Sequence, residues 1–148
     1  MSPIGTKEEF RAPSHILEKE RERLGIKTPH TPIVVSAENL VGTWVNISHD
    51  TRDLVRLMVS LKGNEIVVHA FGACHPNPCD WGQAPARMYA ENVASAPATS
   101  LIANYKFDFA EVAVTARLLK GALFVESFTH FTDQSGRADY YALDIMSK

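Results

Sequence analysis

This chain of 148 residues has few cysteines, no long apolar run and no large excess of either charge. Each of these features excludes a class of protein. Two cysteines are too few for a disulfide-rich scaffold, so a hydrophobic core must supply the stability. No apolar run approaches the roughly 20 residues of a membrane-spanning helix. The segment Met1–Arg11 is polar and lacks the apolar stretch of a secretory signal, so the cytoplasm is the expected location.

The charge balance argues against two classes of macromolecular partner. Lysine and arginine number 15 and aspartate and glutamate 17, which gives a formal net charge of −2. A chain with this balance has no general attraction for nucleic acid or for an anionic membrane, so we expect neither as a partner. With 45% hydrophobic and 22% charged residues, the composition is that of a globular protein, and the length predicts one domain with a real core.

The signatures of several common catalytic machineries are missing as well. The sequence contains no Gly-rich phosphate loop, no nucleophile elbow around a serine and no His-Glu-x-x-His helix. We therefore expect no cofactor.

Residues 1–40 predict an N-terminal arm with a short helix. Ser14 offers an N-cap to a charged helix over His15–Leu24, and Gly25 ends it. The connector Thr28–Pro32 is stiff because each residue before a proline is pushed out of helix. The favoured interpretation is a packing arm or a dimer clasp, which makes a homodimer one expected assembly; the alternative is a functional lid.

Period-2 patterns take over at residue 41 and predict a β-barrel domain over 41–148. The expected strands are Gly42–Ile47, Leu54–Leu61, Glu65–Phe71, Ala86–Val93, Leu101–Phe109, Glu111–Leu118, Leu123–Thr132 and Arg137–Met146. Hairpin residues such as Lys62-Gly63-Asn64 supply short links, and short links join neighbouring strands antiparallel. The fold class predicted is all-β: an eight-stranded antiparallel up-and-down barrel, calycin-like, with an N-terminal helical extension.

The alternation also predicts which face of a strand is buried. Tyr105, Phe107 and Phe109 oppose Asn104, Lys106 and Asp108, and Val112, Val114, Ala116 and Leu118 oppose Glu111, Thr115 and Arg117. Burial energetics assigns the first set of each pair to the core. An eight-stranded barrel is just wide enough to be filled by side chains or to hold one small ligand, and the sequence leaves both outcomes open.

Two resemblances support this fold. The Gly42-x-Trp44 motif, after a short turn over Ser36–Asn39, resembles the entry of lipocalins and the wider calycin group, which implies that Trp44 plugs the closed end. The pattern Gly42-Thr43-Trp44-Val45-Asn46, followed by Cys74-His-Pro-x-x-Cys79-Asp-Trp81-Gly, resembles a small bacterial β-barrel family. That resemblance implies a fixed unit of the fold and no particular activity.

Cys74 and Cys79 flank a loop restricted by two prolines. The favoured interpretation is a disulfide or a simple structural loop, with a free thiol pair expected in a reducing cytosol. A zinc site would add His69 and His75 to the two thiolates, and a catalytic cysteine is a third interpretation. We assign Cys74, Cys79 and Trp81, with Trp44, to structural roles and predict no metal site.

Candidate site residues lie mostly on the polar faces of the strands. His69, Glu126 and His130 are the acid or base candidates, and Arg56 or Arg117 could steady an oxyanion. The ligand-binding candidates are Arg56, Phe71, Tyr105, Arg117, Phe124, Phe128 and Tyr140. If these faces look inward they form a polar set in an aromatic cup; the aliphatic faces opposite favour the outward orientation.

The sequence supports three hypotheses about the function of the protein. The favoured one is a small-molecule-binding barrel that takes one largely apolar ligand at its open end. The runner-up is a cofactor-free isomerase or cyclase that acts on a flexible hydrophobic metabolite inside the barrel. The third is a protein-interaction module.

Overall fold

A computed structural model describes residues 19–20, 23–25 and 32–148. The chain divides between Ile33 and Val34 into two units. In the first unit Lys19, Glu20 and Arg23 are helical, and Gly25 takes a positive φ of 69°, the conformation typical of a residue that follows a helix. Leu24, the last residue of the predicted arm helix, is in a turn and its N–H donates to the Glu20 carbonyl at 3.1 Å. Residues 15–18 and 21–22 of that helix lie outside the described residues.

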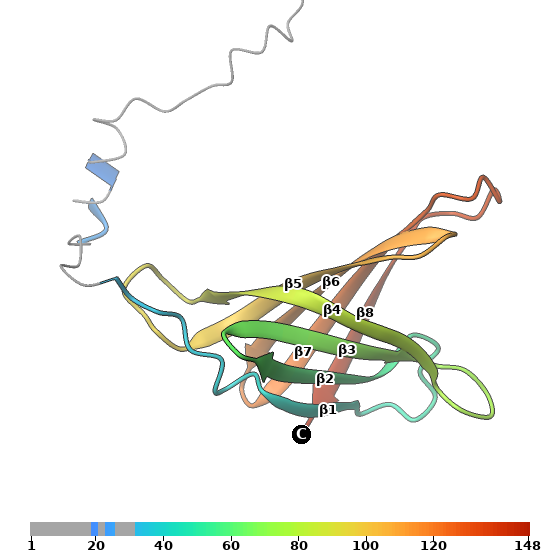
Figure 1. Ribbon diagram of the computed structural model, residues 1–148, viewed down its shortest axis with the longest axis horizontal. Coiled ribbons are helices and arrows are strands. Elements are labelled where there is room, and N and C mark those ends of the chain that lie inside the picture. The colour runs from blue at the N-terminus through green and yellow to red at the C-terminus, as the bar shows by residue number, and fades with distance from the viewer. Residues whose placement is uncertain (1–18, 21–22, 26–31) are drawn as a thin grey trace, which may run out of the picture. The chain divides into compact units, whose positions relative to one another are not determined.

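The second unit is a closed antiparallel barrel of eight strands in sequence order, which confirms the predicted fold class (Figure 1). The strands are β1 (Gly42–Asn46), β2 (Leu54–Lys62), β3 (Glu65–Gly72), β4 (Cys79–Ala90), β5 (Ala98–Lys106), β6 (Ala110–Leu119), β7 (Ala122–Phe131) and β8 (Tyr140–Ser147). The ring closes where β1 pairs with β8, at Val45–Ser147 and Asn46–Met146. This barrel is compatible with a calycin-like fold.

The fourth strand begins earlier than the sequence predicted. We expected it at Ala86, but β4 starts at Cys79, so Trp81 and Gly82 belong to a strand rather than to a long link. The β3–β4 register shifts between His69 and Phe71, and Gly82 has a positive φ of 80°. A β-bulge at this point, together with Pro85, hides the period-2 pattern on which the prediction depended.

One end of the barrel is closed by the segment that precedes β1. Leu40 is fully buried, and its carbonyl accepts a hydrogen bond of 2.8 Å from the indole nitrogen of Trp44. Ser36 forms a parallel bridge with Pro97 in the β4–β5 loop at the same end. Trp44 is 2% exposed and belongs to the core cluster, beside the segment that closes this end.

The opposite end carries the loops that follow β1, β3, β5 and β7 (Figure 1). Several inward aromatic side chains at this end are only partly buried. Trp81 and Phe107 are only partly buried against the core cluster, and Tyr140 is 49% exposed. We call this end the mouth.

Candidate ligand-binding site

The mouth contains an aromatic pocket of about 420 Å³. Its lining residues are Cys79, Trp81, Phe107, Phe109, Val112, Thr129, Phe131, Arg137 and Tyr140. The rings contact one another: Trp81 meets Phe107 edge-on with centroids 5.5 Å apart, and Phe107 stacks on Phe109 at 5.6 Å. Aromatic pairs of this geometry stabilise each other beyond the area they bury, so the wall of the pocket is held in place before any ligand arrives.

A smaller pocket of about 140 Å³ adjoins the aromatic one. The two share Cys79, Trp81 and Tyr140 as lining residues, and the smaller pocket adds Arg52, Asp53 and others. We treat them as two parts of one mouth. The smaller part brings polar groups of the β1–β2 loop next to the aromatic rings.

A buried carboxylate anchors the polar side of the mouth. Asp144 is 5% exposed, and its oxygens accept hydrogen bonds from the Asn46 side-chain amide at 2.8 Å, the Thr51 hydroxyl at 3.0 Å and the Leu54 backbone N–H at 3.3 Å. A buried carboxylate needs such donors, because an unpaired charge in an apolar interior is very costly. Burial, with a contribution from Asp144, raises the pKa of nearby Asp53.

Arg137 is the cation that lies against the aromatic wall. Its guanidinium carbon is 4.0 Å from the ring centroid of Phe131. Its Nη2 donates to the Asp133 carboxylate at 2.7 Å, and its Nε donates to the Ser135 hydroxyl at 2.9 Å. Its charge is therefore already paired within the β7–β8 loop.

The structure joins Cys74 and Cys79 in a disulfide with a Cα–Cα distance of 5.4 Å. The favoured interpretation of these cysteines included this bond, whereas the free thiol pair expected for a reducing cytosol is not what the structure shows. The zinc interpretation loses its two thiolate ligands. In the described part of the chain, His, Cys, Asp and Glu form no group of three or more that could hold a metal ion.

Tyr105 supports the pocket from behind. Its hydroxyl accepts from the Ala70 N–H at 3.1 Å and lies 2.8 Å from the Gly82 carbonyl, to which it donates. These are backbone groups that the β3–β4 bulge removes from the ladder, so the phenol satisfies them in place of a strand partner. Burial raises the pKa of Tyr105. Its ring also packs edge-on against Trp81 at 5.5 Å.

The three acid or base candidates face outward and are not brought together. His69 lies on β3 between Val68 and Ala70, both of which are fully buried, so its side chain points away from the interior. Glu126 and His130 share the outer face of β7, and that strand is not a neighbour of β3 in the barrel.

Each candidate has a partner on the outer wall. The His69 imidazole pairs with Asp80, and this hydrogen bond, helped by the Gly82 N–H, lowers the pKa of that carboxyl. His130 pairs with Asp139 at 2.7 Å, which raises the pKa of the imidazole. Glu126 accepts a hydrogen bond of 3.0 Å from the Tyr141 hydroxyl and thereby raises the pKa of that phenol.

The ligand-binding candidates separate in the same way. Arg56, Phe71, Arg117, Phe124 and Phe128 occupy outward strand positions, and the Arg56 guanidinium covers the Phe71 ring at 4.1 Å. Tyr140 lines the mouth, and Tyr105 lies behind it.

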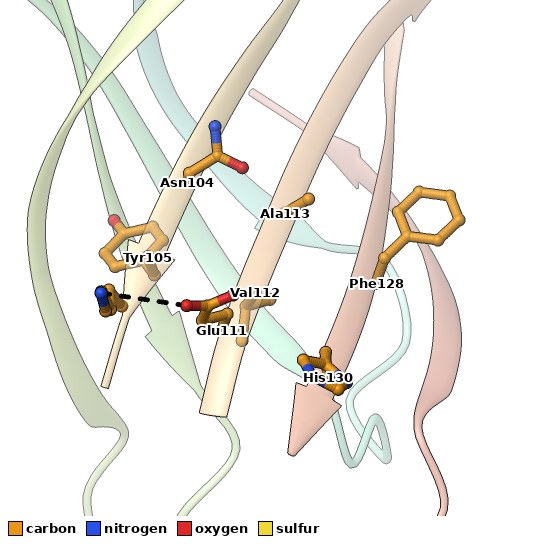
Figure 2. A pocket seen from close by; sticks show the side chains of 8 residues that line it. Asn104, Tyr105, Glu111, Val112, Ala113, Phe128 and His130 are labelled. Carbon is orange, nitrogen blue, oxygen red and sulfur yellow. Dashed lines mark ion pairs between the residues drawn. The ribbon is translucent and has the colours of Figure 1, made fainter. Parts of the chain in front are cut away.

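A further hollow of about 380 Å³ lies on the outer wall across β5, β6 and β7 (Figure 2). Its lining residues are Asn104, Tyr105, Lys106, Glu111, Val112, Ala113, Phe128 and His130. Figure 2 shows the small Ala113 side chain between those of Asn104 and Phe128, which leaves room above the sheet. Lys106 and Glu111 are 4.0 Å apart and well exposed, so this pair contributes little. The hollow lacks the aromatic enclosure of the mouth.

Most residues of the mouth are not predicted as site residues from the sequence. Trp81 is predicted only in a structural role, and the sequence patterns do not single out Phe131, Arg137, Asp53 or Asp144. A signal for Asp144 exists: it holds an inward position of β8 between the buried Ala142 and Met146. A carboxylate in such a register indicates a polar network inside the barrel.

Comparisons of the chain with protein-family models, with curated proteins and with solved structures found no match. Among the described residues, no helix is long and apolar enough to cross a membrane.

Proposed function

We propose that this protein is a small-molecule-binding barrel that takes one largely apolar ligand in its mouth. The observation that carries the proposal is the aromatic pocket of about 420 Å³ above a filled closed half. Binding sites for small molecules are typically pockets of about 300–1,000 Å³ with mostly apolar and aromatic walls. The partly exposed rings of Trp81 and Phe107 would gain burial when a ligand covers them.

The isomerase or cyclase hypothesis receives less support from the geometry. Its acid and base candidates, His69, Glu126 and His130, lie on the outer wall and engage Asp80, Tyr141 and Asp139. Chemistry inside the barrel would need groups at the mouth instead. The outer hollow is the place where an interaction module would bind a protein, but its charged residues are exposed and paired.

Kinship with lipocalins and with the small bacterial barrel family, a homodimeric assembly and a cytoplasmic location stay predictions from the sequence. The disulfide bears on location, because such bonds persist mainly in oxidising compartments. Mass measurement of protein isolated with its thiols trapped would show whether Cys74 and Cys79 are paired where the protein works.

The binding proposal is tested with N-phenylnaphthylamine, an uncharged probe that becomes fluorescent in apolar sites. Trp81→Ala removes a wall of the mouth and is expected to weaken binding about tenfold, since one aromatic contact is worth up to about 1.5 kcal/mol beyond its buried area. Phe128→Ala is the matched control, an aromatic truncation in the outer hollow that should leave binding unchanged. Binding that survives Trp81→Ala and is lost in Phe128→Ala would place the ligand outside the barrel.

A further inference from the structure

Two side chains that carry a hydroxyl line the mouth and make no side-chain hydrogen bond within the described part of the protein. Ser127 and Thr129 occupy inward positions of β7 and are 5% and 8% exposed. Ser127 lines the smaller pocket and Thr129 the aromatic one. Among the side-chain hydrogen bonds of residues 32–148, the buried bonds involve Trp44, Asn46, Tyr105 and Asp144, and neither hydroxyl takes part.

Among the described residues, the only side-chain nitrogen or oxygen that is buried without a partner is Arg56 Nε, so the Ser127 and Thr129 hydroxyls are accessible from the pocket and can hydrogen-bond a ligand there. The two side chains are two residues apart on one strand, so their hydroxyls lie on the same face of the sheet. One polar end of a bound molecule could therefore meet both. An aliphatic or fully apolar ligand would leave them unsatisfied.

The charges around the mouth disfavour an anion at that end. Asp53 lines the smaller pocket together with Ser127, and burial, with a smaller contribution from Asp144, raises the pKa of Asp53. Two cations are near: Arg137 is paired with Asp133, and Arg52 is exposed, where solvent screens its charge. A carboxylate on the ligand would thus meet repulsion from Asp53 without a free buried cation to offset it.

The aromatic walls of the mouth favour a flat ligand. Phe107 and Phe109 stack with an interplanar angle of 11°, and Phe131 stacks on Tyr140 with centroids 6.1 Å apart. Flat faces of this kind bind an aromatic ring in offset or edge-on geometry.

From these observations we infer that the mouth takes a planar, uncharged arene with one hydrogen-bonding end, such as a hydroxyarene, held by Ser127 and Thr129, and discriminates against an arene carboxylate. This inference rests on the proposed function and specifies the ligand class of the same site.

The test uses three probes that share one ring system: 2-naphthol, naphthalene and 2-naphthoate, measured by equilibrium dialysis at neutral pH. We expect 2-naphthol to bind about tenfold more tightly than naphthalene, which corresponds to one or two net hydrogen bonds. The double variant Ser127→Ala/Thr129→Val keeps the side-chain volumes close to those of the native residues. It should reduce 2-naphthol to the affinity of naphthalene and leave naphthalene itself unchanged.

The comparison with 2-naphthoate tests whether the charges around the mouth disfavour an anionic ligand. We expect 2-naphthoate to bind at least about tenfold more weakly than 2-naphthol, and Asp53→Asn to narrow that difference several-fold. Tighter binding of 2-naphthoate, lost on Arg52→Gln or Arg137→Gln, would make the mouth an anion site and overturn the inference.

The outcomes separate this inference from the function on which it rests. If all three probes bind equally well and all depend on Trp81, the mouth is a binding site but the ligand class is wrong. If none binds, or if Trp81→Ala changes nothing, the proposed function itself fails.

Discussion

The closed half and the mouth of this barrel are built from the same eight strands, yet their inward side chains differ in kind. In the closed half Leu57, Leu101, Leu123 and Met146 are 0–2% exposed and fill the interior. At the mouth the inward positions carry aromatic rings that meet edge-on or in offset stacks, together with small hydroxyl residues. An eight-stranded barrel can be filled or hollow, and here the choice is made layer by layer along the axis.

This difference assigns folding stability mainly to the closed half and ligand binding to the mouth. Aliphatic side chains that interdigitate leave no space for a ligand, and their burial is the main source of folding free energy. Rings that only partly cover one another leave apolar surface exposed, which a ligand can bury.

Trp44→Ala should break the closed half. The indole is 2% exposed and donates to the Leu40 carbonyl, so the substitution removes a large buried side chain and leaves that carbonyl without its partner. We expect a loss of about 3–5 kcal/mol in the free energy of unfolding, measured by urea denaturation. Phe128→Ala, an exposed aromatic on the outer wall, should cost less than about 1 kcal/mol. Similar losses for both variants would contradict the assignment of Trp44 as the closing residue.

Replacing both cysteines by serine should have the next largest effect. The disulfide closes a loop with a sequence separation of 5, for which the chain-entropy account gives about 2 kcal/mol. The same urea experiment measures the loss, and it should be accompanied by weaker probe binding because Cys79 lines the mouth. Addition of reductant to the wild-type protein should reproduce the change and have no effect on the double variant.

Gly72→Ala should disturb the mouth from behind. A Cβ at this position would lie 2.8 Å from the indole nitrogen of Trp81, so the indole has to move. We expect a cost of about 1–2 kcal/mol in stability and a changed Trp81 fluorescence spectrum. In a Trp81→Phe background the indole nitrogen is gone, and the cost of Gly72→Ala should become smaller. An equal cost in both backgrounds would mean that the strain falls elsewhere.

Asp53→Asn should produce the smallest change, and one that depends on pH. Because the fold raises the pKa of Asp53 above its ordinary value of 3.8, the folded state holds this proton more tightly than the unfolded state. The loss of stability caused by ionised Asp53 is therefore absent below pH 3.8, and it develops as the pH rises from there through the pKa of Asp53 in the folded state. We expect the variant to be more stable than wild type by about 0.5 kcal/mol at neutral pH, since solvent screens the group, and unchanged in acid. If Asp53→Asn stabilised the protein only in acid, the result would contradict a raised pKa of Asp53 in the folded state.

The sequence predicted the barrel well, because strand number and inward faces follow directly from side-chain alternation. Tyr105 and Val112 are predicted in the core and are buried, and Asn104 and Glu111 are exposed. The core prediction is wrong for Phe109, which is 47% exposed because it lies beyond the end of β5 at Lys106. The start of β4 could not be read in this way. A bulge shifts the pattern, and the groups that stabilise it, the Tyr105 hydroxyl and the Gly82 carbonyl, are 23 residues apart in the chain.

The site was harder to predict for a different reason. Histidine, glutamate and arginine attract attention by their chemistry, but His69, Glu126 and His130 occupy outward positions, where water solvates a charged group at little cost. The mouth instead uses residues such as Phe131 and Ser127, which are ordinary in a strand. Their role depends on which end of the barrel lies open, and that is fixed by the chain before β1 and by Trp44.

The short pairing between β1 and β8, which closes the barrel, has a consequence for how the protein folds. The residue pairs Val45–Ser147 and Asn46–Met146 form it, and just beyond β1 the Ile47 N–H donates to the Ile145 carbonyl at 2.9 Å. The buried hydrogen bond from Asn46 to Asp144 joins residues 98 positions apart. Contacts of such long sequence separation pay their loop-closure entropy before they return any stabilisation, so they form late and slow the folding of β-barrels. We therefore expect the ring to close late at Asn46, so that the carboxylate that organises the polar side of the mouth acquires its amide partner in that same step.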